Sequence, residues 1–214
     1  MPPLSFDPNG DVISAIDLRL EEDALAWVAA SEAKKPLRPQ FRAEFVRTLR
    51  TLNPLPRRIL ELGSGPGRLA REIIDALTPD EYVLFDFSEP MMALAKRELE
   101  LSSGATFVLG SFKTPDWTDA LLGPFDAIVA MQAVHEIRHK RHVPQLYARA
   151  RQLLHPGGLL IVCDHEPAES AESWIVELHS TRAEQQKALE TAGFVDIECR
   201  LFEQQLYLVS ARTN

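Results

Sequence analysis

The sequence predicts an α/β fold: a mostly parallel, doubly wound sheet that ends in an antiparallel hairpin and is preceded by N-terminal helices. From Arg58 onward, strand-like and helix-like segments alternate, which is typical of a parallel sheet with helices on both faces. A glycine-rich turn joins the first strand to the first helix after it. After Gly193, two strand-like runs are separated by a gap too short for a crossover helix, so they have to pair antiparallel.

The first fifty-odd residues predict two amphipathic helices, Val12–Glu32 and Gln40–Leu52. Trp27, Phe41 and Phe45 give these helices apolar contacts, and the Pro-rich segment 53–56 forms a stiff connector to the first strand. We therefore expect an N-terminal helical cap over residues 1–56 and a second domain over residues 57–214.

Five strands and their helices are expected before the hairpin. The strands are Ile59–Leu62, Tyr82–Asp86, Ala105–Leu109, Phe125–Met131 and Leu159–Cys163, and the hairpin strands are Phe194–Leu201 and Gln205–Ala211. One helix begins after Ser88 as N-cap, and another, beginning near Val143, is ended by residues 155–158. A third helix has capping-box spacing from Thr181 to Glu184.

Composition limits the class of protein. With 214 residues and 45% hydrophobic content, the chain suits one domain with a full core and a small appendage. A net charge of −8 argues against nucleic acid and anionic membranes as partners. The only two cysteines, Cys163 and Cys199, lie far apart and form no metal-binding pattern. No membrane span or signal peptide is recognisable, so a cytoplasmic protein is expected.

The segment Arg57–Ala70 carries the strongest motif. A short apolar run ends in Glu61, and glycines follow at positions 63, 65 and 67 before a helical pattern resumes. Glycines in such a turn let a ligand lie against bare backbone. A dinucleotide fingerprint would place its third Gly or Ala at position 68, where this chain has Arg68.

This segment resembles the first motif of the class I S-adenosylmethionine-dependent methyltransferases. Leu84–Met91 is similar to the family's second motif, Phe125–Glu136 to its fourth, and Arg151–Leu160 to the helix-turn-strand before strand five. The resemblance covers Arg57 to Arg212 with the motifs in order. It implies a Rossmann-like fold, S-adenosylmethionine as cofactor, and an enzyme that methylates.

The resemblance also implies a set of cofactor-binding residues. Asp86 lies about 20 residues beyond the glycine loop, where its carboxylate can accept both ribose hydroxyls; alternatively it caps a helix. Glu61 is expected to shape the loop and hold the cofactor's amino group. The full set is Glu61, Gly63, Ser64, Gly65, Gly67, Asp86, Phe87, Met91, Gly110, Ser111, Phe112, Met131 and Gln132.

Ser111 departs from the family pattern, and the role of Phe112 stays open. Many relatives carry an acid after the third strand, where this chain has Gly110-Ser111-Phe112. The serine hydroxyl would hold the adenine amino group less strongly than a charge. Phe112 either stacks on the adenine or belongs to the core.

His135 is the candidate catalytic residue. As a neutral imidazole facing the methyl group it could take a proton from a hydroxyl; alternatively it lines the cofactor pocket or bonds the backbone. His135, His139 and His142 have a spacing that suggests a metal site, but the basic residues between them oppose a cation. No metal is therefore expected. Residues 164–166 either border the substrate or form a polar strand exit.

The leading hypothesis is a methyltransferase acting on an oxygen, nitrogen or carbon atom of a small-molecule acceptor. The Asn-Pro-Pro-Tyr signature of amino-group methylation on DNA or protein is absent. Two alternatives remain: a non-catalytic S-adenosylmethionine-binding scaffold, and a nicotinamide-dependent oxidoreductase. The N-terminal helices and His165–Ser180 are expected to cover the acceptor site, because ligands lie beyond the carboxyl ends of parallel strands.

Overall fold

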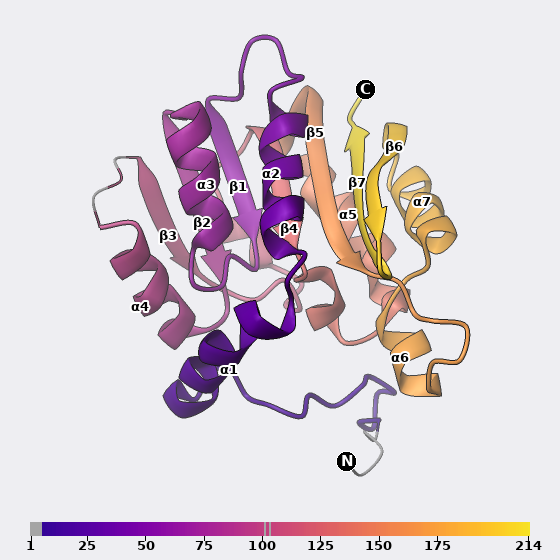
Figure 1. The fold of residues 1–214 in the computed structure, drawn as a ribbon. Helices are drawn as coiled ribbons and strands as arrows, with labels where there is room; N and C mark the ends of the chain where they lie inside the picture. The colour runs from indigo at the N-terminus through magenta and orange to yellow at the C-terminus, as the bar shows by residue number, and fades with distance from the viewer. Residues whose placement is uncertain (1–5, 101, 103) are drawn as a thin grey trace.

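A central seven-stranded sheet organises the chain (Figure 1), with strand order β3-β2-β1-β4-β5-β7-β6. The computed structural model describes residues 6–100, 102 and 104–214, without the side chains of residues 32–34. The strands are β1 (Arg58–Leu62), β2 (Glu81–Asp86), β3 (Ala105–Leu109), β4 (Phe125–Met131), β5 (Leu154–His165), β6 (Val195–Glu203) and β7 (Leu206–Arg212). Strands β1 to β5 pair parallel, and β7 pairs antiparallel with both β5 and β6. The predicted fold class is confirmed.

Helices cover both faces of the sheet. The α-helices are α1 (Glu21–Lys34), α2 (Arg38–Leu49), α3 (Arg68–Leu77), α4 (Glu89–Glu98), α5 (Val143–Gln152), α6 (Ser173–Leu178) and α7 (Arg182–Thr191). Helices α2, α3 and α4 contribute to the hydrophobic cluster on one face, and α5 and α7 to the cluster on the other. Among the described residues, every helix is too short or too polar to cross a membrane.

The two cores explain why the strands are apolar almost throughout. Along β2, Tyr82 and Leu84 join the cluster under α2 and α3, whereas Val83 and Phe85 join the opposite cluster. Successive side chains of a strand point to opposite faces, so a sheet covered on both faces needs apolar residues at consecutive positions.

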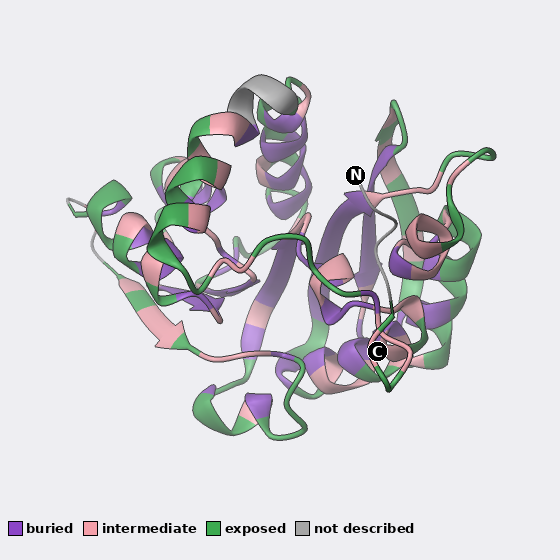
Figure 2. Ribbon diagram, turned by 90° about the horizontal axis from the view of Figure 1, so that it is seen from below, coloured by how far each residue is buried: buried purple, intermediate pink, exposed green. Residues whose placement is uncertain are grey.

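The predicted helix from Val12 was wrong in its first nine residues, because α1 begins at Glu21. Residues 12–20, which we call the N-terminal strap, instead run along the carboxyl edge of the sheet (Figure 2). The Val12 amide donates to the carbonyl of Arg138 at 2.9 Å, which holds the start of the strap against the loop after β4. Acidic residues in the first turn of α1 favour its helix start at that point.

Helix α2 packs on the sheet. Phe41 and Phe45 are fully buried in the same cluster as Ile59 of β1 and Ile161 of β5. The predicted division at residue 56 stays a prediction, and residues 1–5 of that N-terminal region lie outside the described residues.

Most other local predictions are confirmed. Ser88 Oγ accepts a hydrogen bond from the Met91 amide at 3.1 Å and so caps α4. Thr181 and Glu184 form a reciprocal capping box at the start of α7. Strand β5, however, begins at Leu154 rather than Leu159, and α5 already ends at Gln152, because the backbone of Leu154 pairs with that of Phe125 in β4.

Candidate active site

A cavity of about 390 Å³ lies at the carboxyl edge of the sheet, beneath the strap and α1. The predicted cofactor residues that line it are Glu61, Gly63, Ser64, Gly65, Asp86, Phe87, Met91, Phe112, Met131 and Gln132, and His135 joins them. Gly67, Gly110 and Ser111 are not among the lining residues. Its size falls within the range of small-molecule and cofactor sites, about 300–1,000 Å³. The structure therefore brings most of the predicted residues to one space.

The glycine loop meets the cavity through Gly65. Gly63 and Gly65 both have positive φ angles, 67° and 52°. A Cβ on Gly63 would lie 2.4 Å from the Cβ of Ala133, whereas a Cβ on Gly65 would meet nothing within 4 Å. Gly63 is thus required for packing, and Gly65 leaves its backbone open to a ligand.

Asp86 ties this loop to the start of α4. Its Oδ2 accepts the Gly65 amide at 2.7 Å, and its Oδ1 accepts the Ser88 amide at 2.9 Å. Burial raises the pKa of Asp86, and the hydrogen bonds from Ser88 and Gly65 oppose that rise. The helix-start and ligand-facing interpretations are therefore compatible, since each oxygen keeps a further acceptor position.

Glu61 is a fully buried carboxyl group beside the loop. Tyr82 donates its hydroxyl to Glu61 Oε2 at 2.7 Å. Burial raises the pKa of Glu61 from 4.5 to about 8, with the Tyr82 hydrogen bond opposing and the nearby Asp86 charge adding to the rise. A cationic group placed beside Glu61 would favour its carboxylate form.

His135 and Asp164 form a tight pair across the ends of β4 and β5. Asp164 Oδ1 lies 2.7 Å from His135 Nδ1, and Oδ2 accepts the His135 amide at 3.0 Å. Burial lowers the pKa of His135 and the Asp164 charge raises it, and the net effect is a value above the ordinary 6.5. Although burial opposes it, the positive charge on His135 lowers the pKa of Asp164. The pair orients the ring and leaves its Nε2 beyond the Asp164 contact.

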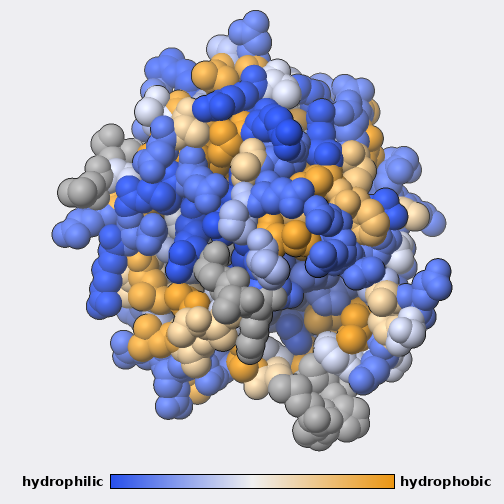
Figure 3. Space-filling view, in the orientation of Figure 1, coloured by the Kyte–Doolittle hydropathy of each residue, from blue (hydrophilic) through white to orange (hydrophobic). Residues whose placement is uncertain are grey.

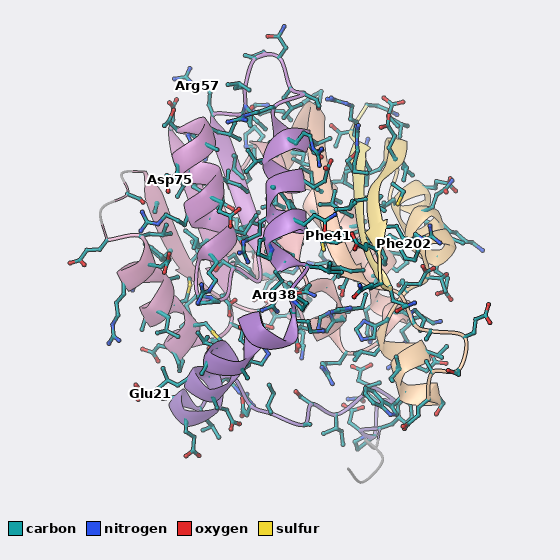
Figure 4. All side chains as sticks on the ribbon, viewed as in Figure 1. Glu21, Arg38, Phe41, Arg57, Asp75 and Phe202 are labelled. Carbon is teal, nitrogen blue, oxygen red and sulfur yellow. The ribbon has the colours of Figure 1, made fainter. Side chains whose placement is uncertain are left out.

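Two further histidines lie against His135 and stay neutral. Burial lowers the pKa of His165 to about 3 and that of His179 to about 4. Gln132 Nε2 lies 2.8 Å from His165 Nε2, and Arg38 Nε donates to Gln132 Oε1 at 2.6 Å. Because the Gln132 amide nitrogen can only donate, His165 accepts at Nε2 and carries its proton on Nδ1. Figure 4 shows Arg38 at the bend between α1 and α2.

Within the described part of the chain, one group of side chains is close enough together to be considered as a metal site. It consists of His135, Asp164 and His179, whose ligand atoms lie within 4.8 Å of one another. Zn–N bonds of about 2.0–2.1 Å in a tetrahedral site imply ligand separations of about 3.3 Å. The 2.7 Å contact between His135 and Asp164 is that of a hydrogen bond instead. His139 and His142 point elsewhere, to Glu177 and Asp11.

A comparison of the sequence with known families identifies the central part of the chain. A methyltransferase domain family matches residues 60–160, the stretch that carries the glycine loop, Asp86 and His135. Residues 60–160 form a methyltransferase domain of the class I, S-adenosylmethionine-dependent type. The nicotinamide alternative is therefore set aside.

Individual relatives resemble this methyltransferase domain over most of the chain. The phthiotriol/phenolphthiotriol dimycocerosates methyltransferase of Mycobacterium leprae is 27% identical over 175 residues, covering 82% of this chain and 62% of the relative. The demethylmenaquinone methyltransferase of Thermus thermophilus is 30% identical over 118 residues, covering 54% of this chain and 50% of the relative. This chain thus spans less than two thirds of the relatives' length.

Solved structures agree on the fold. Human N-acetylserotonin methyltransferase in complex with SAM superposes with a TM-score of 0.70 at 18% identity, covering 94% of this chain and 60% of that one. The methyltransferase CalH in complex with SAH gives a TM-score of 0.63 at 21% identity, covering 79% and 55%.

Several residues of this candidate site were not predicted from the sequence. His179 lies more than forty positions from His135 along the chain, yet their rings are 4.9 Å apart. Lys35 and Arg38 reach the cavity from the α1–α2 turn. Their only local signal is the basic Pro-rich segment 34–39, which is typical of a break between two helices rather than of a site.

The glycine loop generates a first prediction. Gly65→Val should lower the unfolding free energy by about 1–2 kcal/mol, because residue 65 has a left-handed backbone conformation. The variant should still fold, but it should fail to bind S-adenosylhomocysteine. Gly63→Ala should destabilise the protein more, because its Cβ overlaps that of Ala133. Urea unfolding and calorimetric titration measure both effects. Normal binding by Gly65→Val would place the cofactor elsewhere.

Glu61 generates a second prediction. Between pH 4.5 and about 8 the unfolded chain releases the Glu61 proton while the folded protein keeps it, so this group lowers stability as pH rises. Glu61→Gln, which can still accept from Tyr82, should gain stability relative to the wild type as pH increases from 5.5 to 8. Thermal unfolding of Glu61→Gln and of the exposed control Glu22→Gln tests this. If the stability difference between Glu61→Gln and the wild type is the same at pH 5.5 and at pH 8, the prediction is wrong.

Proposed function

We propose that this chain transfers a methyl group from S-adenosylmethionine to a small-molecule acceptor, with His135 as the general base. The main supporting observation is that His135, whose ring is held by Asp164, lines the same cavity as the glycine loop and Asp86. The related methyltransferases are named for phthiotriol, demethylmenaquinone and N-acetylserotonin, which supports a small-molecule acceptor.

The residues present fit the cofactor. Gly65 has open space where a side chain would lie, so backbone can approach a ligand there. Asp86 keeps acceptor positions that ribose hydroxyls could use. Glu61 lines the same cavity, where the cofactor's amino group would favour its carboxylate form. Phe87 and Met91 line the cavity beside Asp86, consistent with their flanking the adenine. S-adenosylmethionine, when bound, supplies the activated methyl group.

His135 performs the proton transfer. Its Nε2 would take the proton from the acceptor's hydroxyl, amine or activated carbon. S-adenosylmethionine would supply the methyl group from its sulfonium and leave as S-adenosylhomocysteine. Asp164 holds Nδ1–H and stabilises the imidazolium that results, so the ring keeps one orientation. Because the pKa of His135 lies above 6.5, the neutral base is populated only as pH rises above that value.

The surroundings of the site favour transfer away from water. Ser14, Ile16 and Leu18 of the strap line the cavity from one side, and Trp174 and Leu178 of α6 line it from another. These are the two regions expected to cover the acceptor. The closure of these two regions on ligand binding stays a prediction. The cytoplasmic location and the lack of a nucleic-acid partner also stay predictions.

The cofactor assignment is tested through Asp86. Asp86→Ala should weaken S-adenosylhomocysteine binding by about 1.5–3 kcal/mol, the value of a hydrogen bond to a charged group. Asp75→Ala, on the outer face of α3 (Figure 4), is the matched control with a 62% exposed side chain. Calorimetric titration of folded variants decides. Unchanged affinity in Asp86→Ala would reject the assignment.

The base is tested by rate and by pH. His135→Gln should lower kcat by about 10²–10⁴-fold while leaving S-adenosylhomocysteine affinity unchanged. The wild-type rate should rise with pH through an inflection above 6.5, and Asp164→Asn should move that inflection downward because it removes the charge that raises the pKa of His135. His155→Gln, which is exposed, is the control. A pH-independent rate, or full activity in His135→Gln, would eliminate His135 as base.

A further inference from the structure

A second cavity of about 500 Å³ adjoins the first. It lies between the start of α2, the segment after β5, α6 and the β6–β7 turn. Five side chains line both cavities: Lys35, Arg38, Gln132, His165 and His179. The wall between the cofactor cavity and the second cavity is therefore made of basic and amide groups next to His135.

The lining of the second cavity is mixed, with apolar walls and a localised positive charge. Leu37, Ile175 and Leu206 contribute to its walls together with prolines and alanines. Its acidic lining residue, Glu166, is already paired: Arg182 donates to it through the backbone amide and Nε, each at 2.9 Å. The remaining charged lining groups of the described chain are the cations Lys35 and Arg38.

Lys35 makes no direct ion pair with the carboxylates whose side chains the structure describes, although the charge of Asp164 acts on it. Its ammonium lies 3.1 Å from His165 Nε2, the ring nitrogen that also faces the Gln132 amide at 2.8 Å. Lys35 is exposed by surface area; partial desolvation and the nearby Arg38 charge lower its pKa, and the Asp164 charge opposes them. A further anion beside Lys35 would favour its charged form.

We propose that the second cavity binds the apolar body of the methyl acceptor and that the acceptor carries a carboxylate that pairs with Lys35. This inference rests on methyl transfer at His135. The His165 ring separates the two groups: it contacts Lys35 directly, and its centroid is 6.2 Å from that of His135. The proposal therefore requires an acceptor that extends past the His165 ring, with its carboxylate beside Lys35 and its reacting atom beside His135. The hydrogen bonds from Arg38 through Gln132 keep this ring in place.

Matched pairs of hydroxybenzoates and hydroxybenzamides test the proposal. Binding to the protein saturated with S-adenosylhomocysteine is measured by calorimetry and saturation-transfer NMR. The acid of at least one pair should bind roughly 10- to 100-fold more tightly than its amide, as expected for a hydrogen-bonded charge pair. Lys35→Met should abolish this preference, and Lys35→Arg should retain it. Lys187→Met, exposed on α7, should leave it unchanged.

The outcomes separate the alternatives. A protein that fails to bind S-adenosylhomocysteine overturns the proposed function itself. If that ligand binds but no acid is preferred over its amide, the carboxylate proposal is wrong and methyl transfer is unaffected. If Lys35→Met weakens S-adenosylhomocysteine binding as much as acid binding, Lys35 serves the cofactor's own carboxylate and the acceptor proposal is likewise overturned.

Discussion

The shared direction of strands β1 to β5 is the constraint on which the site depends. Because they run parallel, their carboxyl ends meet at one edge, and the acids at those ends lie around one space. Asp86 at the end of β2 and Asp164 near the end of β5 each accept a backbone amide from a neighbouring loop, that of Gly65 and that of His135. The sheet thus positions the loops that carry chemistry through carboxylates at its strand ends.

Three buried carboxyl groups at this edge of the sheet, Glu61, Asp86 and Asp164, differ in pKa because their partners differ. Glu61 has one hydroxyl donor, and burial raises its pKa to about 8. Asp86 has backbone amide donors that oppose the effect of burial without cancelling it. Asp164 faces the His135 ring as well as amides, and its pKa falls. Donor number and a nearby positive charge therefore decide which acid stays ionised in the same low-dielectric edge.

The local charge at the cavity wall is opposite to the charge of the whole chain. The protein carries a net charge of −8, yet Lys35 and Arg38 line both cavities beside neutral histidines. A net charge reports on long-range attraction to large partners and says little about a half-buried site. The outer surface around this edge is mixed: Leu20 and Leu25 are exposed near α1, where apolar groups gather in Figure 3.

The sequence by itself determined the alternation of strands and helices, the closing hairpin, the glycine loop and the strand-end acid Asp86, because each depends on periodicity or turn chemistry within a few residues. It misjudged Val12–Leu20, whose apolar residues suit a helix but whose backbone bonds the distant Arg138 carbonyl. Only the tertiary structure decided that Asp164 holds His135, that His179 joins them, and that Lys35 borders both cavities. Those contacts join segments far apart along the chain, and they form only when helices and strands pack, so no local pattern records them.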